Sequence, residues 1–253
     1  THTNPDGDAI GSLLSMGLAL AELGKRVTLY CQSPIPAVYK FLPFVNRIKR
    51  TIKHAADCDT VVVLDCGDLE RIGESASMAG QIPVMINIDH HITNMKTLQS
   101  LNISNMNALF MMGTPGVHMT WSYLYSNTPI MLDCKALYYI GLKDVWKHEL
   151  DIEAVYFTTA FERPSTWEEW LPYIQNNDLA HVVIERGKII YEYTQSVLNT
   201  MMQQVRYSTW RGFTIAIVNV PFPWISDIGA LMCNTDPANT IAVIWYKTPT
   251  DQY

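Results

Sequence analysis

Two apolar runs, each closed by an aspartate, constrain the fold of this chain more than any other feature. The run TVVVLDC covers residues 60–66, and the run IPVMINID covers residues 82–89. Both are apolar nearly throughout and rich in β-branched side chains, which predicts buried strands of a parallel sheet. A helical pattern precedes them at residues 9–26 and meets Gly24 as a stop signal. The alternation of strand and helix patterns predicts βαβ units and an α/β fold.

The remaining segments extend this pattern and then change it. Further helices are predicted over residues 116–126 and 134–146, and VTLYC at residues 27–31 is predicted as a strand. After Trp146, the segment 161–178 predicts a connection with a short helix. The end of the chain predicts a long helix over residues 178–205 and then a small β-α-β unit, formed by a strand at 212–220, a helix at 226–234 capped by Ser226, and a strand at 240–247.

Composition limits the class of protein. The 253 residues are 48% hydrophobic and 17% charged, which is typical of a globular chain. The longest apolar runs are far shorter than the roughly 18 residues that span a bilayer, so we expect a soluble protein. The five cysteines include no C-x-x-C pair, which argues against a disulfide framework or a zinc–cysteine site and favours the cytoplasm. The net charge of −6 argues against binding of long duplex nucleic acid.

Side chains that bind metals follow both predicted strands. Asp65 follows the first strand, and Asp89, His90 and His91 follow the second. The carboxyl ends of parallel strands share one edge of a sheet, where ligands bind in open α/β folds. The segment THTNPDGDAIGS before the first helix and the end of the helix at 134–146 add four more residues: His2, Asp6, Asp8 and Asp144.

Carboxylates and imidazoles without thiolates suit Mn²⁺ or Mg²⁺ better than structural zinc. Several aspartates so close together would repel one another unless cations lay between them. Two metals about 3.5–4 Å apart would neutralise them and form a site for hydrolysis of phosphate esters. Each cluster alone has a simpler explanation, as a helix cap, a solvated loop or a surface acid. The coincidence of three clusters at one predicted edge favours the metal site. The tryptophans and tyrosines are most simply core residues, and their spacing selects none for stacking on a base.

Four segments carry a resemblance to a known family. In chain order, HTNPDGDAIGS, VVVLDCGD, NIDHHITN and YYIGLKDVWKHE resemble the four motifs of the DHH phosphoesterase superfamily. The triplet Asp89-His90-His91 corresponds to the Asp-His-His that gives the family its name. The Asp-Val-Trp-Lys form of the fourth motif resembles the oligoribonuclease, or nanoRNase, branch.

The resemblance implies an architecture. It predicts an N-terminal parallel-sheet DHH domain over residues 1–155, a helical linker over 156–207, and a smaller, incomplete C-terminal α/β domain for substrate over 208–253. The Gly-Gly-Gly-His segment that usually occurs in the DHH-associated C-terminal domain does not occur in this sequence. The chain also begins at Thr1 without a methionine, so we expect a piece of a longer protein, cut at both ends.

The resemblance also implies roles for single residues. By similarity, one metal would be held by His2, Asp6 and Asp65. The other metal would be held by Asp8, Asp65, His90 and Asp144, which makes Asp65 the bridging ligand. His91 would face the phosphate, and Asp89 would orient a neighbouring histidine.

The predicted function is a divalent-metal-dependent phosphodiesterase that hydrolyses short single-stranded RNA or related small nucleotides through water activated by two metals. Mn²⁺ is the leading expectation for the metal, with Mg²⁺ and Co²⁺ as alternatives. No membrane partner is expected, and the oligomeric state is left open. Alternative substrates are 3′-phosphoadenosine 5′-phosphate, a cyclic dinucleotide, and pyrophosphate or polyphosphate. Two other hypotheses for the function are a catalytically inactive nucleotide-binding regulatory module and a scaffold that binds metal for stability alone.

Overall fold

The computed structural model divides the chain into two compact units, Thr1–Gly187 and Lys188–Tyr253, with the boundary inside helix α8 (Asp178–Met202). The predicted domain limits at residues 155 and 207 remain a proposal beside this division. The structure describes residues 1–52, 57–75, 79, 81–92, 106–125, 134–235 and 240–246.

The first unit contains a parallel sheet in the order β1-β2-β3. Its strands are β1 (Thr60–Leu64), β2 (Val84–Asp89) and β3 (Met106–Phe110). In register, Leu64 pairs with Ile88, and Asp89 pairs with Phe110. The predicted α/β class and both predicted parallel strands are confirmed. Strand β3 was not predicted.

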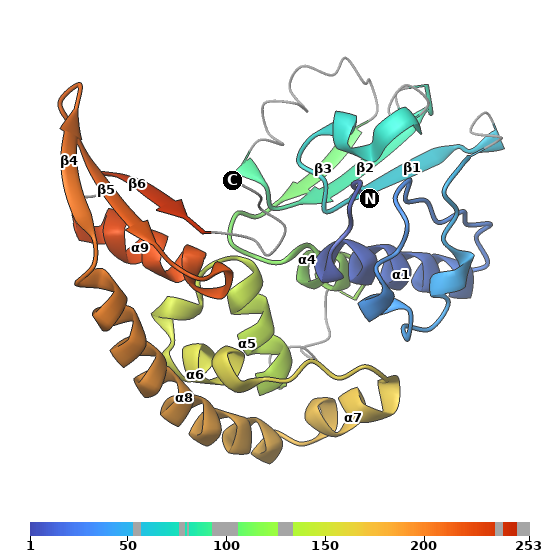
Figure 1. The fold of residues 1–253 in the computed structure, drawn as a ribbon. Coiled ribbons are helices and arrows are strands. Elements are labelled where there is room, and N and C mark those ends of the chain that lie inside the picture. The colour runs from blue at the N-terminus through green and yellow to red at the C-terminus, as the bar shows by residue number, and fades with distance from the viewer. Residues whose placement is uncertain are drawn as a thin grey trace. The chain divides into compact units, whose positions relative to one another are not determined.

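Both faces of this sheet are covered, as a parallel sheet requires. Helices α1 (Gly7–Glu22) and α4 (Gly116–Leu124) lie side by side on one face (Figure 1). Their core with the sheet includes Leu13, Met16, Leu64, Ile88 and Met119. On the other face, Ile72 of the 3-10 segment η4 (Leu69–Ser75) packs with Val63, Ala79 and Met85.

After α4, the described part of the first unit is mainly helical. It contains α5 (Lys135–Asp144), α6 (Ile152–Ala160), α7 (Trp167–Gln175) and the first part of α8. Phe157 of α6 is fully buried and packs with Tyr139 of α5 and with Val183 and Ile184 of α8. The described residues of this unit also include the short 3-10 segments η1 (Ala37–Tyr39), η2 (Val45–Arg47) and η5 (His148–Leu150). The predicted helices at 116–126, 134–146 and 178–205 are present, and so is the short helix after residue 161.

In its described residues, the second unit contains a three-stranded sheet, the second part of α8 and helix α9 (Ile225–Thr235). Strand β4 (Arg206–Trp210) runs antiparallel to β5 (Phe213–Asn219), and β5 pairs in parallel with β6 (Thr240–Trp245). Helix α9, which follows η6 (Phe222–Trp224), packs on the sheet (Figure 1). The core of this unit is formed by Leu198, Ala216, Val218, Val220, Ile228 and Met232. The predicted β-α-β unit is therefore present, with β4 as an addition.

Two local predictions are wrong. The segment VTLYC forms no strand: Tyr30 makes a single isolated bridge to Lys49, because this stretch pairs with an irregular segment instead of a sheet strand. Ser226 is not the cap of its helix, since α9 begins one residue earlier, directly after η6. Local sequence did not indicate that a 3-10 turn would already start the helical backbone.

Among the helices in the described part of the chain, none is both long enough and apolar enough to cross a bilayer.

Candidate metal centre

Asp65 lies at the point where strand β1 ends. Its backbone N–H donates to the carbonyl of Ile88 at 2.9 Å, so the residue is still tied to β2. Its φ of 48° turns the chain out of the strand, a left-handed conformation that aspartate adopts more readily than most residues. Its side chain is 1% exposed. A charged carboxylate is therefore buried at the carboxyl edge of the sheet.

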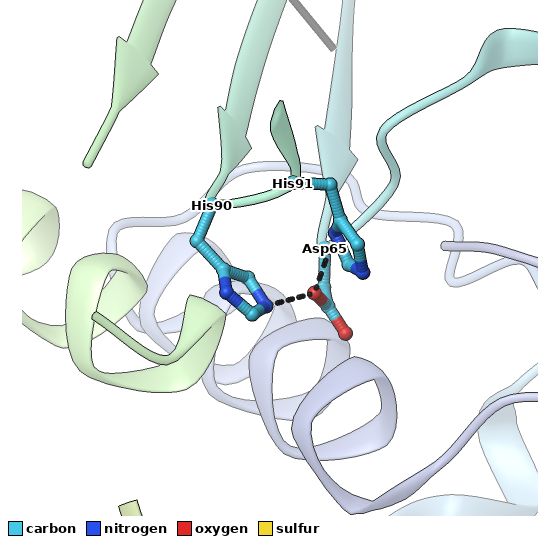
Figure 2. A group of neighbouring side chains, drawn as sticks. All are labelled: Asp65, His90 and His91. Carbon is cyan, nitrogen blue, oxygen red and sulfur yellow. Dashed lines mark ion pairs between the residues drawn. The ribbon is translucent and has the colours of Figure 1, made fainter. Parts of the chain in front are cut away.

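Three histidines surround this carboxylate. Nε2 of His90 lies 3.2 Å from Oδ1 of Asp65, and Nδ1 of His91 lies 3.7 Å from the same oxygen. Figure 2 shows both rings, which follow β2, directed at Asp65 at the end of β1. The other oxygen, Oδ2, lies 3.7 Å from Nε2 of the buried His2. Asp65 is thus the residue on which the cluster converges.

Asp8 reaches the cluster from the first turn of helix α1. Its two carboxylate oxygens accept hydrogen bonds from the backbone N–H groups of Gly116 at 2.6 Å and Val117 at 2.5 Å, at the start of α4. N–H groups at the start of a helix have no partner within the helix, and together with the helix dipole they favour a negative charge at this end of α4. Nε2 of His90 lies 3.6 Å from Asp8 Oδ2. Asp8 therefore links the start of α1, the start of α4 and the end of β2.

The approach of α4 depends on Gly116 having no side chain. A Cβ at this position would lie 3.1 Å from both Asp65 Cβ and Asp8 Oδ2. Such contacts are tighter than nine in ten real Cβ contacts, so a side chain here would require Asp65 and Asp8 to move by a few tenths of an ångström.

Asp6 and Asp144 complete the acidic lining of a pocket at this edge. Asp6 caps helix α1 by accepting a hydrogen bond from Ala9 N at 3.0 Å. Asp144 is the last residue of α5 and comes from the helical part of the unit. The pocket is lined by Asp6, Asp8, Asp65, His90, His91, Asp144 and Trp146.

The two adjacent histidines both lie near Asp65 but differ in their nearest carboxylate. His90 faces Asp8 and Asp65, whereas Nδ1 of His91 lies 2.7 Å from Oδ1 of the fully buried Asp89. Their ring centroids are 4.5 Å apart at 48°, so the rings are neighbours without being parallel. The aspartate fixes the orientation of the His91 ring through Nδ1 and leaves Nε2 directed elsewhere.

Burial and, second to it, repulsion between the acids raise the pKa values of Asp8 and Asp144. Burial raises the pKa of Asp8 to about 7, with further increases from Asp65 and Asp144. Burial also raises the pKa of Asp144 to about 6, together with the charges of Asp6 and Asp65. Asp8 and Asp144 are therefore hard to ionise when no cation is present.

Asp65 behaves in the opposite way. Its burial acts to raise the pKa, but hydrogen bonds from His2 and His90 and the charges of His90 and His91 hold it below the ordinary range. The bond to Asp65 correspondingly raises the pKa of His90, and the bond to Asp89 raises the pKa of His91. Asp65 is therefore the permanent negative charge of the cluster.

The donor atoms fit divalent cations. Three groups have candidate ligand atoms within 4.8 Å of one another: His2, Asp6 and Asp65; Asp8, His90 and Asp144; and Asp65, His90 and His91. All donors are oxygen or nitrogen, as Mn²⁺ and Mg²⁺ prefer. Within the described part of the chain, the buried Oδ1 of Asp65 makes no hydrogen bond of normal geometry. A cation would satisfy that oxygen and relieve the repulsion.

All eight residues predicted from the sequence meet in this cluster, whereas two contributors were not predicted. Gly116 allows the close approach of α4, and Trp146 lines the pocket. A glycine at the start of a predicted helix and an exposed aromatic residue after Asp144 are weak signals, because neither reveals its distant neighbours.

Comparison with known proteins identifies the family. Residues 1–142, more than half of the chain, match the model of the DHH family, N-terminal domain. The chain belongs to the DHH family. The resemblance predicted from the four motifs is confirmed, and residues from each of the four motifs line the pocket described above.

A curated relative of this DHH-family chain is the bifunctional oligoribonuclease and PAP phosphatase NrnA of Thermus thermophilus, which is 38% identical over 97 residues. The match covers 37% of this chain and 27% of that relative, so it spans well under half of the relative's length.

Two solved structures also resemble the chain. One is an exopolyphosphatase-related protein from Bacteroides fragilis, with a TM-score of 0.45 and 16% identity, covering 90% of this chain and 66% of that one. The other is the DHH domain of a member of a family of ribosomal proteins, with a TM-score of 0.47 and 14% identity, covering 97% of this chain and 70% of that one.

Proposed function

We propose that the first unit is the catalytic part of a divalent-metal-dependent phosphoesterase. The observation that carries this proposal is Asp65, a buried carboxylate with donors of two candidate metal groups on either side. Membership of the DHH family supports it, because all four motifs of the family contribute to the pocket.

The proposed ligand sets start from two of the groupings in the structure, with Asp65 added to the second as the bridging ligand. His2, Asp6 and Asp65 would hold one ion, and Asp8, Asp65, His90 and Asp144 would hold the other. Bound divalent ions would neutralise these carboxylates, polarise the phosphate and make water a stronger nucleophile near neutral pH. Mn²⁺ is the proposed ion, with Mg²⁺ and Co²⁺ as alternatives.

The protein's own groups prepare the site. The N–H groups of Gly116 and Val117 hold both oxygens of Asp8, so this carboxylate does not need to reorganise when it binds an ion. Asp89 holds Nδ1 of His91, and the raised pKa of His91 favours the protonated ring. Nε2–H of His91 would then donate to a phosphate oxygen and stabilise the charge that develops there.

The proposed substrates are short oligoribonucleotides or small nucleotides. The name of the Thermus relative includes oligoribonuclease activity, and the net charge of −6 suits a small substrate held by cations better than a long duplex. All five cysteines are free, in accord with the proposed cytoplasmic location. A second candidate, hydrolysis of 3′-phosphoadenosine 5′-phosphate, is favoured by the other activity in the same relative's name.

The test uses two substitutions, one at each end of a strand. Asp65→Asn removes the charge at the carboxyl end of β1 while nearly keeping its shape, and Asp59→Asn makes the same change just before the other end of β1, where the residue is exposed. We expect Asp65→Asn to lose most Mn²⁺ binding in titration calorimetry and most Mn²⁺-dependent cleavage of a diribonucleotide. Asp59→Asn should keep both.

A substrate panel separates the alternatives. Diribonucleotide, 3′-phosphoadenosine 5′-phosphate, a cyclic dinucleotide and pyrophosphate are compared at saturating Mn²⁺. Retention of Mn²⁺ binding and cleavage by Asp65→Asn would contradict the bridging role. Tight binding of nucleotide by the unchanged chain without any cleavage would replace the enzyme by a regulatory nucleotide-binding module.

A further inference from the structure

Helix α5 ends in a conformation that favours glycine, but the residue in that position is a tryptophan. Trp146 has a φ of 57°. Its N–H donates to the carbonyl of Lys143 at 3.1 Å, and the N–H of Lys147 donates to the carbonyl of Leu142 at 2.8 Å. This pair of hydrogen bonds is the Schellman motif, in which glycine is usual because it has no Cβ to clash in the left-handed region.

Helix α1 closes with the same motif and uses the usual residue. Gly24 has a φ of 73°, its N–H donates to Ala21, and the N–H of Lys25 donates to Leu20, both at 3.0 Å. The end of α1 therefore has glycine at the left-handed position, whereas the end of α5 has tryptophan there. A bulky residue in this region is a genuine outlier and costs stability.

Packing does not explain the tryptophan. Trp146 is 76% exposed, so it contributes little to the core of the unit. Within the described residues, its ring is approached by the ammonium of Lys143, whose Nζ lies 5.6 Å from the ring centroid. The large exposed fraction leaves ring surface available for a further planar partner.

The location of Trp146 beside the pocket can explain why a tryptophan occupies this turn. Trp146 follows Asp144 by two residues and lines the same pocket as Asp8, Asp65 and His90. The left-handed turn is therefore what carries an exposed indole to the rim of the acidic cluster. A planar aromatic surface beside a site that would hold a phosphate matches a nucleotide, which has a phosphate and a planar base.

We propose that Trp146 is a specificity-determining residue that stacks on the base of the substrate while its phosphate lies at the carboxylate–imidazole cluster. The inference rests on the proposed function. It adds recognition of the base, whereas the acidic cluster would bind only the phosphate. Stacking is possible for every base, so Trp146 selects nucleotides over pyrophosphate and polyphosphate without selecting among the bases.

The experiment separates base recognition from phosphate recognition. Mn²⁺-loaded protein is titrated calorimetrically with adenosine monophosphate and with ribose 5-phosphate, which lacks the base. Trp146→Ala should weaken binding of adenosine monophosphate by roughly 5- to 150-fold, the range found when one stacking aromatic is removed. Binding of ribose 5-phosphate should not change, and Trp146→Phe should keep most of the affinity. Trp167→Ala, a half-exposed tryptophan on α7 outside the pocket, is the matched control.

Kinetics give a second readout. With a diribonucleotide and its abasic analogue, Trp146→Ala should raise KM for the first alone and leave kcat within about twofold. Trp146→Gly should show the same loss of base recognition while its melting temperature stays at or above that of the unchanged chain, because glycine relieves the strained backbone.

Three results would overturn the inference: equal affinity of the unchanged protein for adenosine monophosphate and ribose 5-phosphate, equal losses for both ligands in Trp146→Ala, or unchanged adenosine monophosphate binding in that variant. The proposed function fails differently, by the absence of Mn²⁺-dependent cleavage of every substrate, and the calorimetric comparison is informative in either case.

Discussion

At the scale of single residues, the site depends on where carboxylates are forced to approach one another. Asp65 turns out of its strand with a positive φ, and Asp8 is held by two backbone N–H groups of another helix. The absence of a side chain at Gly116 lets both groups approach α4. The close spacing of the acids is therefore a property of backbone geometry as much as of side-chain chemistry.

Gly116→Ala tests this dependence on geometry. The added methyl group would lie 3.1 Å from Asp65 Cβ and from Asp8 Oδ2, so we expect Mn²⁺ affinity to fall by about tenfold, equivalent to about 1.4 kcal/mol, within the usual cost of overpacking. Gly11→Ala is the control, because its methyl group would meet the Val117 side chain instead of the acids. Unchanged affinity in Gly116→Ala, measured calorimetrically, would show that the cluster adapts easily.

Protonation of Asp8 should make metal affinity depend on pH. Its pKa is raised to about 7 and the pKa of Asp144 to about 6, so both are partly protonated at pH 6 in the metal-free protein. A metal ion requires the ionised carboxylates and must displace these protons. Mn²⁺ affinity should therefore rise between roughly pH 5.5 and pH 7.5, up to about tenfold per pH unit for each proton released.

Calorimetry in two buffers of different ionisation enthalpy measures the protons released. Release should be smaller at about pH 8 than at about pH 6, because Asp8 and Asp144 are mostly ionised at the higher pH before the metal binds. Asp8→Asn should lower the release at the lower pH. An affinity that stays constant over the same range would contradict the raised pKa values.

At the scale of elements, α8 packs closely against α6 because Gly187 has no Cβ at the point of contact. A Cβ on Gly187 would overlap the backbone oxygen of Tyr156, and backbone cannot move aside as a flexible side chain can. One helical turn away, Val183 and Ile184 of α8 pack against the buried Phe157 of α6. A glycine inside a helix is usually unfavourable, so close packing accounts for its presence here.

Gly187→Ala should destabilise the first unit although alanine is the better helix former. We expect a loss of about 1–3 kcal/mol in the free energy of unfolding, measured by urea denaturation. Lys188→Ala, at the next and exposed position of α8, should change it by about 0.5 kcal/mol or less. A stabilised Gly187→Ala would mean that α6 and α8 are farther apart than the structure shows.

Sequence patterns predicted elements best where periodicity was strong and uninterrupted. β1, β2, α1 and α8 are long or strongly apolar, and all four were predicted. β4 was missed because its five residues, RYSTW, are all exposed and carry no alternation of buried and exposed positions. VTLYC was overpredicted because strand propensity says nothing about whether a partner strand is present.

At the scale of the whole molecule, the chain consists of two units with separate cores, and the residues that line the candidate metal centre lie in the first. Mn²⁺ bound by the folded first unit should stabilise that unit and raise its melting temperature. The expected gain in the free energy of unfolding is about 2.7 kcal/mol at a Mn²⁺ concentration of about 100 times the dissociation constant. Differential scanning calorimetry should show one transition shifting with Mn²⁺ and one remaining. Ile228→Ala, in the second core, should lower the transition that Mn²⁺ does not shift.

Without metal, the stability of the first unit should fall as pH rises from about 4 to about 7. The raised pKa values of Asp8 and Asp144 mean that the folded state binds more protons than the unfolded state in this range, so their contribution is lost as pH passes about 6 and then about 7. The raised pKa values of His90 and His91 act in the same direction at higher pH. Asp65, whose pKa is lowered, loses its contribution only in stronger acid.

Melting temperatures measured from about pH 4 to about pH 8 with a chelator present test this dependence, and saturating Mn²⁺ should remove most of it. A melting temperature that rises steadily with pH in the chelated protein would contradict the raised pKa values.

The sequence by itself determined the α/β class, the two strands that end in acids, the family and the residue types of the metal centre. These follow from local patterns, because hydrophobic periodicity and motif spacing are written along the chain. Only the tertiary structure decided that α4 donates two N–H groups to Asp8, 108 residues away in the case of Gly116, and that Asp89 engages His91 while Asp65 engages His90. It also decided that Trp146 takes the left-handed turn at the rim of the pocket. Such features depend on which distant backbone and side-chain groups meet, and packing sets that only when the whole unit folds.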